Sequence, residues 1–161
     1  MNVVETDNND SDNRTDRMMA EAPTASRRQA RRDAMVALYQ NDITGIGPDQ
    51  LYDSLEKEQD HQAAPFTREV VEGVLGRSDE LDAAIDAASR DWPAHRMAAL
   101  ERNILRIAIF EMRHREDIPV EVSIDEAVAL AKRFCSREAG SLVNGILSHI
   151  AEEGRADDKR E

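Results

Sequence analysis

Apolar residues recur at every third or fourth position along nearly the whole chain, which is the spacing of one face of an α-helix. Stretches in which β-branched or aromatic residues alternate with polar ones over the length of a strand are hard to find. The segment 120–124, Val-Glu-Val-Ser-Ile, alternates, but Pro119 before it and a helix-start signal inside it argue against a strand. The periodicity therefore predicts an all-α fold, a compact bundle of about six to seven helices.

The composition limits the folded region to one domain. The chain has 161 residues, of which 40% are hydrophobic and 4% aromatic, so its core must be built mainly from Ala, Leu, Ile and Val. Asp, Asn, Thr and Glu dominate residues 1–25, which hold too few apolar side chains to offset the entropy of ordering them. We expect a disordered acidic tail at 1–25, a helical domain at 26–153 and a disordered C-terminal tail at 154–161.

Start and stop signals give the first two helices. Ser26 is a good N-cap and Gln29 completes a capping box, which predicts a first helix from Ser26 to about Gln40. A second helix is expected over residues 48–59, after the loop that ends at Pro48.

The apolar positions between residues 66 and 89 keep one helical phase across Gly76, which favours one long helix over two short ones. Gly73 and Gly76 each cost about 1 kcal/mol relative to alanine inside a helix. Their presence indicates close packing or a bend at this place.

The second half of the chain predicts three further helices. Residues 98–115 are apolar over more than one face, as in the central helix of a bundle. Ser123 and Glu126 form a second capping box for a helix that ends near Phe134. Ser136 is a candidate cap for the last helix, and Gly154 is placed to end it. A short turn is expected at residues 94–97.

Several classes of function are excluded or unsupported. No apolar run approaches the roughly 20 residues that span a membrane, and the N-terminus does not resemble a signal peptide, so a cytoplasmic protein is expected. Cys135 is the only cysteine and is expected to be inert. The histidines lack the spacing of metal ligands: His61, His95, His114 and His149. Since no catalytic motif is present either, we expect neither an enzyme nor a bound metal or cofactor.

Four arginines within six residues, Arg27, Arg28, Arg31 and Arg32, stand at the start of the first predicted helix in a chain of net charge -12. The helix dipole disfavours cations in the first turn by roughly 0.3 to 1 kcal/mol each, so the arginines are poorly explained as helix stabilisers. Phosphate binding explains them better. Helical spacing extends Arg28 and Arg32 into an exposed stripe with Met35 and Tyr39. The alternative is a solvated face, or one that pairs with the acidic tail or with Asp33.

Four segments in order carry a family resemblance: ARRDAMVALYQ (30–40), ERNILRIAIFEM (101–112), IPVEVSIDEAVALAKRF (118–134) and LVNGIL (142–147). They resemble the successive motifs of the NusB family of bacterial transcription antitermination factors. The resemblance implies two packed helical subdomains and a non-enzymatic role. Members of the family bind single-stranded boxA RNA of ribosomal operons together with the ribosomal protein NusE, and help to load an antitermination complex on RNA polymerase.

The resemblance also implies site residues. The four arginines occupy the principal RNA-contacting segment of the family, and Tyr39 and Glu111 match positions linked to a shared surface for RNA and NusE. From the residues alone, Tyr39 is equally explained as a tyrosine at the edge of the core, and Glu111 as the partner of a neighbouring polar group.

Residues 138–142 match a second RNA-contacting region of the family. There Ser141 and Leu142 replace the usual basic residue and phenylalanine. Loss of the ring removes a stacking surface worth about 1 to 3 kcal/mol in single-strand binders, which predicts weaker RNA binding.

Two hypotheses follow. The first is an antitermination factor that binds boxA RNA with NusE and supports transcription and maturation of ribosomal RNA. The second is a protein-interaction module, such as a homodimer, whose arginine face is covered by protein rather than RNA.

Overall fold

The computed structural model describes residues 24–59 and 61–160. Within these residues the regular structure is helical, which confirms the all-α prediction. The elements in chain order are α2 (Thr24–Thr44), α3 (Pro48–Gln59), α4 (Pro65–Leu75), α5 (Ser78–Ala88), the short 3-10 helix η1 (Ala94–Arg96), α6 (Ala99–His114), α7 (Val120–Phe134) and α8 (Arg137–Asp158). None of these helices is both long and apolar enough to span a bilayer.

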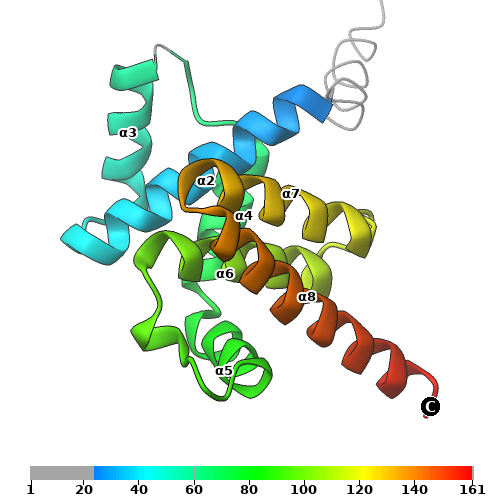
Figure 1. Cartoon of the computed structure of the whole chain (residues 1–161). Helices are drawn as coiled ribbons and strands as arrows, with labels where there is room; N and C mark the ends of the chain where they lie inside the picture. Colours follow the sequence, from blue (N-terminus) through cyan, green and yellow to red (C-terminus); the bar gives the residue numbers. More distant parts are fainter. Residues whose placement is uncertain (1–23, 60, 161) are drawn as a thin grey trace, which may run out of the picture.

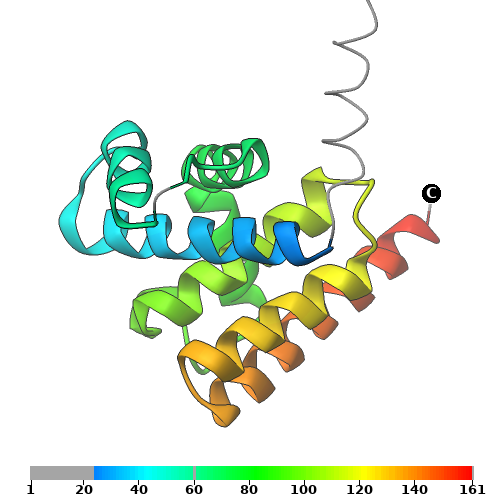
Figure 2. The same cartoon turned by 90° about the horizontal axis from the view of Figure 1, so that it is seen from above.

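Helix α6 is the centre of the bundle, as the sequence predicted. It packs against α2 and α4 on one side and against α5, α7 and α8 on the other (Figures 1 and 2). Its buried side chains cover most of its circumference: Asn103, Ile104, Leu105, Ile107, Ala108, Ile109, Phe110 and Glu111. The two groups of helices that share α6 correspond to the two expected subdomains, with α3 at the outer edge of the first.

The N-terminal part of α2 differs from the prediction. The helix begins by Thr24, so Ser26 lies inside it and is not its N-cap. The amide of Gln29 donates to the carboxylate of Asp33 one turn later, at 2.9 Å, an (i, i+4) pair within the helix. The capping box is therefore wrong. Apart from Thr24 and Ala25, which are helical, the expected acidic tail lies outside the described residues.

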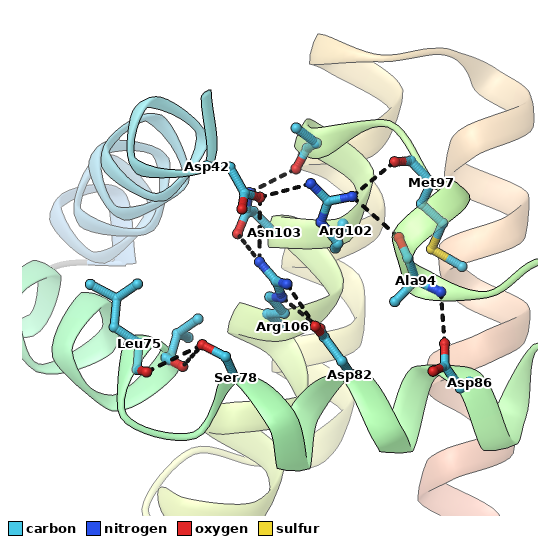
Figure 3. Close-up of polar contacts among 12 residues, drawn as sticks. Asp42, Leu75, Ser78, Asp82, Asp86, Ala94, Met97, Arg102, Asn103 and Arg106 are labelled. Atoms are coloured by element: carbon cyan, nitrogen blue, oxygen red, sulfur yellow. Dashed lines mark hydrogen bonds and ion pairs between the residues drawn. The ribbon is translucent and has the colours of Figure 1, made fainter. Parts of the chain in front are cut away.

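The single helix expected over residues 66–89 is also wrong, because the chain breaks between α4 and α5 at Gly76 and Arg77. The hydroxyl of Ser78 donates to the carbonyl oxygens of Val74 and Leu75, both at 3.2 Å, and thereby satisfies the end of α4 (Figure 3). The hydrophobic phase continues across the break, so periodicity could not reveal it.

Close packing accounts for the other glycine of this segment. A Cβ atom at Gly73 would overlap the ring of Phe110 in α6. The absence of a side chain at Gly73 allows α4 to approach α6, so the predicted close packing is confirmed.

The start of α7 and the end of α8 also differ from the prediction. Helix α7 begins at Val120, directly after Pro119, whose carbonyl accepts the N–H of Ser123 at 3.3 Å. Ser123 is thus buried inside the helix and is not its cap. Helix α8 is capped as predicted, since Ser136 Oγ accepts the N–H of Ala139 at 3.0 Å. It continues through Gly154 to Asp158 because one glycine costs only about 1 kcal/mol in a helix. The predicted end at Gly154 is wrong.

Candidate nucleic-acid interface

The four arginines of α2 face two directions. Residues one turn apart share a helix face, so Arg27 lies with Arg31, and Arg28 lies with Arg32 about 100° further round the axis. The guanidinium carbons of Arg27 and Arg31 lie 4.8 Å and 5.3 Å from the centre of the Phe66 ring in α4. The other pair faces α7. The predicted cluster is therefore two surfaces rather than one.

Arg31 is not a surface residue. Its side chain is 3% exposed, and its Nη2 lies 2.6 Å from Glu111 Oε1 in α6. Its Nε donates to both carboxylate oxygens of Glu111 at 3.0 Å. Glu111 is 1% exposed, so this ion pair joins α2 to α6 inside the core. The expectation of four exposed arginines is wrong for Arg31, and Glu111 satisfies a buried neighbour, which was the second explanation for it.

Arg27 lies in a surface cluster of mixed charge. Arg115 also lies over the Phe66 ring, at 5.3 Å, and it pairs with Asp117 at 2.8 Å and Glu69 at 2.7 Å. The hydrogen bonds from Arg115 lower the pKa of Asp117 to about 2, and the charge of Arg27 adds to this effect. Arg27 therefore lies near the carboxylate of Asp117.

The second pair, Arg28 and Arg32, borders an open groove between α2 and α7 of about 420 Å³, which we call the arginine groove. Arg28 is 67% exposed and pairs with Glu126 at 3.0 Å. The guanidinium carbon of Arg32 lies 5.5 Å from the centre of the Phe134 ring. The lining residues are Arg28, Gln29, Arg32, Glu126, Ala129, Leu130, Arg133 and Phe134. Three arginines and one glutamate give this groove a formal charge of +2, against -12 for the chain.

Tyr39 lies in a neighbouring groove, which we call the Tyr39 groove. Its lining residues are Tyr39, Ile43, Ala98, Ala99, Leu100, Glu101, Phe134, Cys135 and Ser136. Ile43 is 59% exposed there, and the groove is largely apolar. Phe134 borders both grooves and makes them neighbours. Burial, together with the charge of Glu101, raises the pKa of the Cys135 thiol.

The predicted stripe on α2 is only partly on the surface. Met35 is buried in the core, whereas Tyr39 is half-buried at the edge of its groove. The structure places Tyr39 beside Glu101 on the first turn of α6. Glu111 lies ten residues further along the same helix, against Arg31. The structure does not bring Tyr39 and Glu111 together in one groove.

Ser141 and Leu142 lie on the first turns of α8 and border neither groove. Ser141 is exposed, and its hydroxyl donates to the carbonyl of Arg137 at 3.4 Å. Leu142 is half-buried and packs against the core. At Gly140 a Cβ atom would lie 2.5 Å from Lys132 Cγ, so the glycine allows α8 to lie close to α7.

A polar network fixes the C-terminal half of α2 to the rest of the bundle (Figure 3). Asp42 accepts hydrogen bonds from Arg102 at 3.0 Å and from the buried Asn103 at 2.8 Å. Arg106 bridges Asp42, at 3.3 Å, and Asp82 of α5, at 2.7 Å. With the Arg31–Glu111 pair, this network holds α2 on α6 at two points and sets the position of both grooves.

Among the lining residues that sequence reasoning did not assign to a binding surface are Glu101, Arg133 and Phe134. The run Lys-Arg-Phe at 132–134 puts cations beside a ring at the C-terminal end of α7, and this pattern is a usable signal. In the described part of the chain, no group of three or more His, Cys, Asp or Glu residues is arranged to hold a metal ion.

Comparison with known proteins gives a consistent result. The model of the NusB family matches residues 28–152. The chain is 43% identical over 122 residues to the transcription antitermination protein NusB of Rubrobacter xylanophilus, covering 76% of this chain and 87% of that protein. It is 40% identical over 132 residues to the protein of the same name in Myxococcus xanthus, covering 78% and 94%.

Solved structures show the same fold. NusB of T. maritima is 33% identical, with a TM-score of 0.70 over 79% of this chain and 91% of that one. A structure of the antitermination factors NusB and NusE in complex with dsRNA is 25% identical, with a TM-score of 0.73 over 81% of this chain and 99% of that one. Because the family model and these relatives cover nearly all of the helical domain, the chain belongs to the NusB family.

Proposed function

We propose that this chain is a transcription antitermination factor that binds boxA-type single-stranded RNA of ribosomal RNA operons together with ribosomal protein NusE. It acts as a non-enzymatic scaffold in the antitermination complex on RNA polymerase, in the cytoplasm, and supports transcription and maturation of ribosomal RNA. The observation that carries the proposal is the arginine groove, a local charge of +2 on the surface of a NusB-family fold whose net charge is -12.

In this proposal the four arginines divide their roles. Arg28 and Arg32 contact phosphates from the groove, and Arg27 does so from the mixed-charge cluster beside it. Guanidinium groups bind phosphate oxygens with strong, charge-assisted hydrogen bonds. Arg31 acts through its buried pair with Glu111, which positions α2, and does not itself contact RNA.

The Tyr39 groove is the proposed surface shared by RNA and NusE. It is largely apolar and carries the exposed Ile43, as expected of a protein-binding surface. Its acidic residue is Glu101, and we assign to Glu101 the partner-binding role that the family resemblance implies for Glu111. Ser141 and Leu142 lie outside both grooves, and weaker RNA binding at that region stays a prediction.

The proposal is tested by titrating fluorescently labelled boxA RNA with the full-length protein, with and without NusE. R28A/R32A is expected to weaken binding at least about tenfold, since each substitution removes a charge-assisted contact. The variant R90A/R160A is a matched control that removes two exposed arginines outside the groove. Undetectable binding of the wild type even with NusE present, or equal effects of the two variants, contradicts the proposal.

The homodimer alternative is checked in the same samples by sedimentation at several protein concentrations. If a second copy covers the arginine groove, RNA binding weakens as the protein associates, and R28A/R32A changes the sedimentation profile. If the arginine groove faces RNA instead, those substitutions leave the profile unchanged.

A further inference from the structure

The ring of Phe134 lies close to two cations from different helices. The guanidinium carbon of Arg32, on α2, lies 5.5 Å from the centre of the ring, and that of Arg133, on α7, lies 5.2 Å from it. Each distance is within the range of a cation–π contact. The ring therefore holds two positive charges at the edge of the arginine groove, which Arg133 and Phe134 both line.

Neither cation is neutralised by the described part of the chain. Arg28 pairs with Glu126 and Arg31 with Glu111, but neither Arg32 nor Arg133 has a carboxylate within ion-pair distance among the described residues. Arg32 Nε is buried and meets no hydrogen-bond acceptor among those residues. A buried N–H without an acceptor is unfavourable, and an anion bound beside the guanidinium group would compensate its charge.

The position of Phe134 connects this pair to the second groove. The ring borders both the arginine groove and the Tyr39 groove. The two grooves thus form one path on the surface. It begins with the cations Arg28, Arg32 and Arg133 and ends at the aromatic ring of Tyr39. Proteins that bind single-stranded nucleic acid combine a basic groove along the backbone with aromatic side chains for the bases. An acidic peptide has no comparable use for the ring.

We propose that Arg133 contacts RNA directly, and that Arg32 and Arg133 bind neighbouring phosphates of single-stranded RNA where the two grooves meet. Phe134 is a positioning residue that keeps both guanidinium groups at this point. The inference rests on the proposed function, and it adds to the binding surface a residue of α7 that lies outside the arginine run of α2.

The test compares R133Q with R90Q in the full-length protein, using fluorescently labelled single-stranded boxA RNA. Both substitutions remove one positive charge from an exposed arginine, but Arg90 lies outside the groove. R133Q is expected to weaken binding about tenfold and to flatten the log-log salt dependence by about 0.7, the slope per phosphate on single strands. R90Q is expected to weaken binding by less than about twofold and to leave the salt slope unchanged, because the charge of Arg90 is remote from the groove and screened by salt.

The positioning role has its own variant. F134L keeps an apolar side chain against the core but removes the ring, and it is expected to weaken RNA binding without changing the salt slope, because all the cations remain. A thermal unfolding curve confirms that F134L is folded at the assay temperature. If RNA affinity is unchanged in folded F134L, the positioning role is wrong.

The results distinguish a failure of the proposed Arg133 contact from a failure of the RNA-binding function. If R28A/R32A weakens RNA binding while R133Q behaves like R90Q, the RNA-binding function stands and the inference fails. If the wild type binds no RNA even with NusE, both fail. If polyglutamate displaces RNA at equal charge concentration, and its binding depends on Arg133 as strongly, the groove is a site for acidic protein segments and the assignment to RNA is overturned.

Discussion

Arg31 and Glu111 form a bidentate ion pair in the core, with Arg31 Nη2 2.6 Å from Glu111 Oε1 and both side chains almost fully buried. The two residues are 80 positions apart and join α2 to α6. One arginine of a basic cluster is thus part of the scaffold that presents the others.

This pair predicts a large loss of stability when one partner is removed. E111Q leaves Arg31 buried without its counter-charge, and the free energy of unfolding is expected to fall by about 3 to 5 kcal/mol. R31M/E111L removes both charges and is expected to be near neutral or stabilising, by up to about 4 kcal/mol. Urea denaturation measures both values. E121Q, which breaks the exposed Arg155–Glu121 pair, is the control and should cost less than about 1 kcal/mol. A loss in E111Q as small as that in E121Q contradicts the role of the pair.

Gly73 predicts a steric effect at the contact between α4 and α6. In G73A the new methyl group meets the buried Phe110 ring, and the expected loss of stability is about 1 to 3 kcal/mol. Gly145 is also helical but has no atom within 4 Å of an added Cβ, so G145A is expected to stabilise by about 0.5 to 1 kcal/mol. Thermal unfolding of the two variants should move in opposite directions. Equal shifts would show that helix propensity alone governs both positions.

The Asp42 network predicts a dependence of stability on pH. Burial opposes ionisation of Asp42, but hydrogen bonds from Arg102 and Asn103 and the nearby charges of Arg106 and Arg102 lower its pKa below the usual 3.8. A lowered pKa gives stability that is complete above the unfolded value of 3.8 and disappears as the pH falls through the folded value. D42N is therefore expected to be less stable than the wild type by about 1 to 3 kcal/mol at pH 7, with a difference that shrinks below pH 3.8.

Urea unfolding of the wild type and D42N from pH 7 down to acid pH checks this prediction. Other carboxylates titrate in both proteins and cancel in the difference. D53N, at an exposed position in the middle of α3, should differ from the wild type by less than about 0.5 kcal/mol at every pH. If the difference in free energy of unfolding between D42N and the wild type stays constant down to acid pH, the charge of Asp42 does not stabilise the network.

Much of the fold could be predicted from sequence because local signals determined it. The bounds of α3, the cap at Ser136 and the central place of α6 follow from proline, serine and apolar spacing. The apolar phase could not predict the break at Gly76, because it continues through the break, although the glycines of this segment indicated close packing or a bend. The hydroxyl of Ser78 satisfies the end of α4, and that contact depends on the bend itself.

The site was harder to predict because it depends on contacts between distant segments. Spacing alone places Arg28 and Arg32 on one face and Arg27 and Arg31 on another. It does not say which face is buried, because the buried one is determined by Glu111 in another helix. The groove likewise needs Arg133 and Phe134, about 100 residues from Arg32, and only the packing of α2 and α7 on α6 brings them close.

The most direct test of the account is the salt dependence of boxA RNA binding, measured for the wild type, R28A/R32A and R31M/E111L. Contacts from Arg27, Arg28, Arg32 and Arg133 predict a log-log slope near about -3 for the wild type, at about -0.7 per phosphate. R28A/R32A should halve the slope to about -1.4, whereas R31M/E111L should retain the wild-type slope because Arg31 is buried. A slope that R31M/E111L flattens as much as R28A/R32A does, or that R28A/R32A leaves unchanged, contradicts the account.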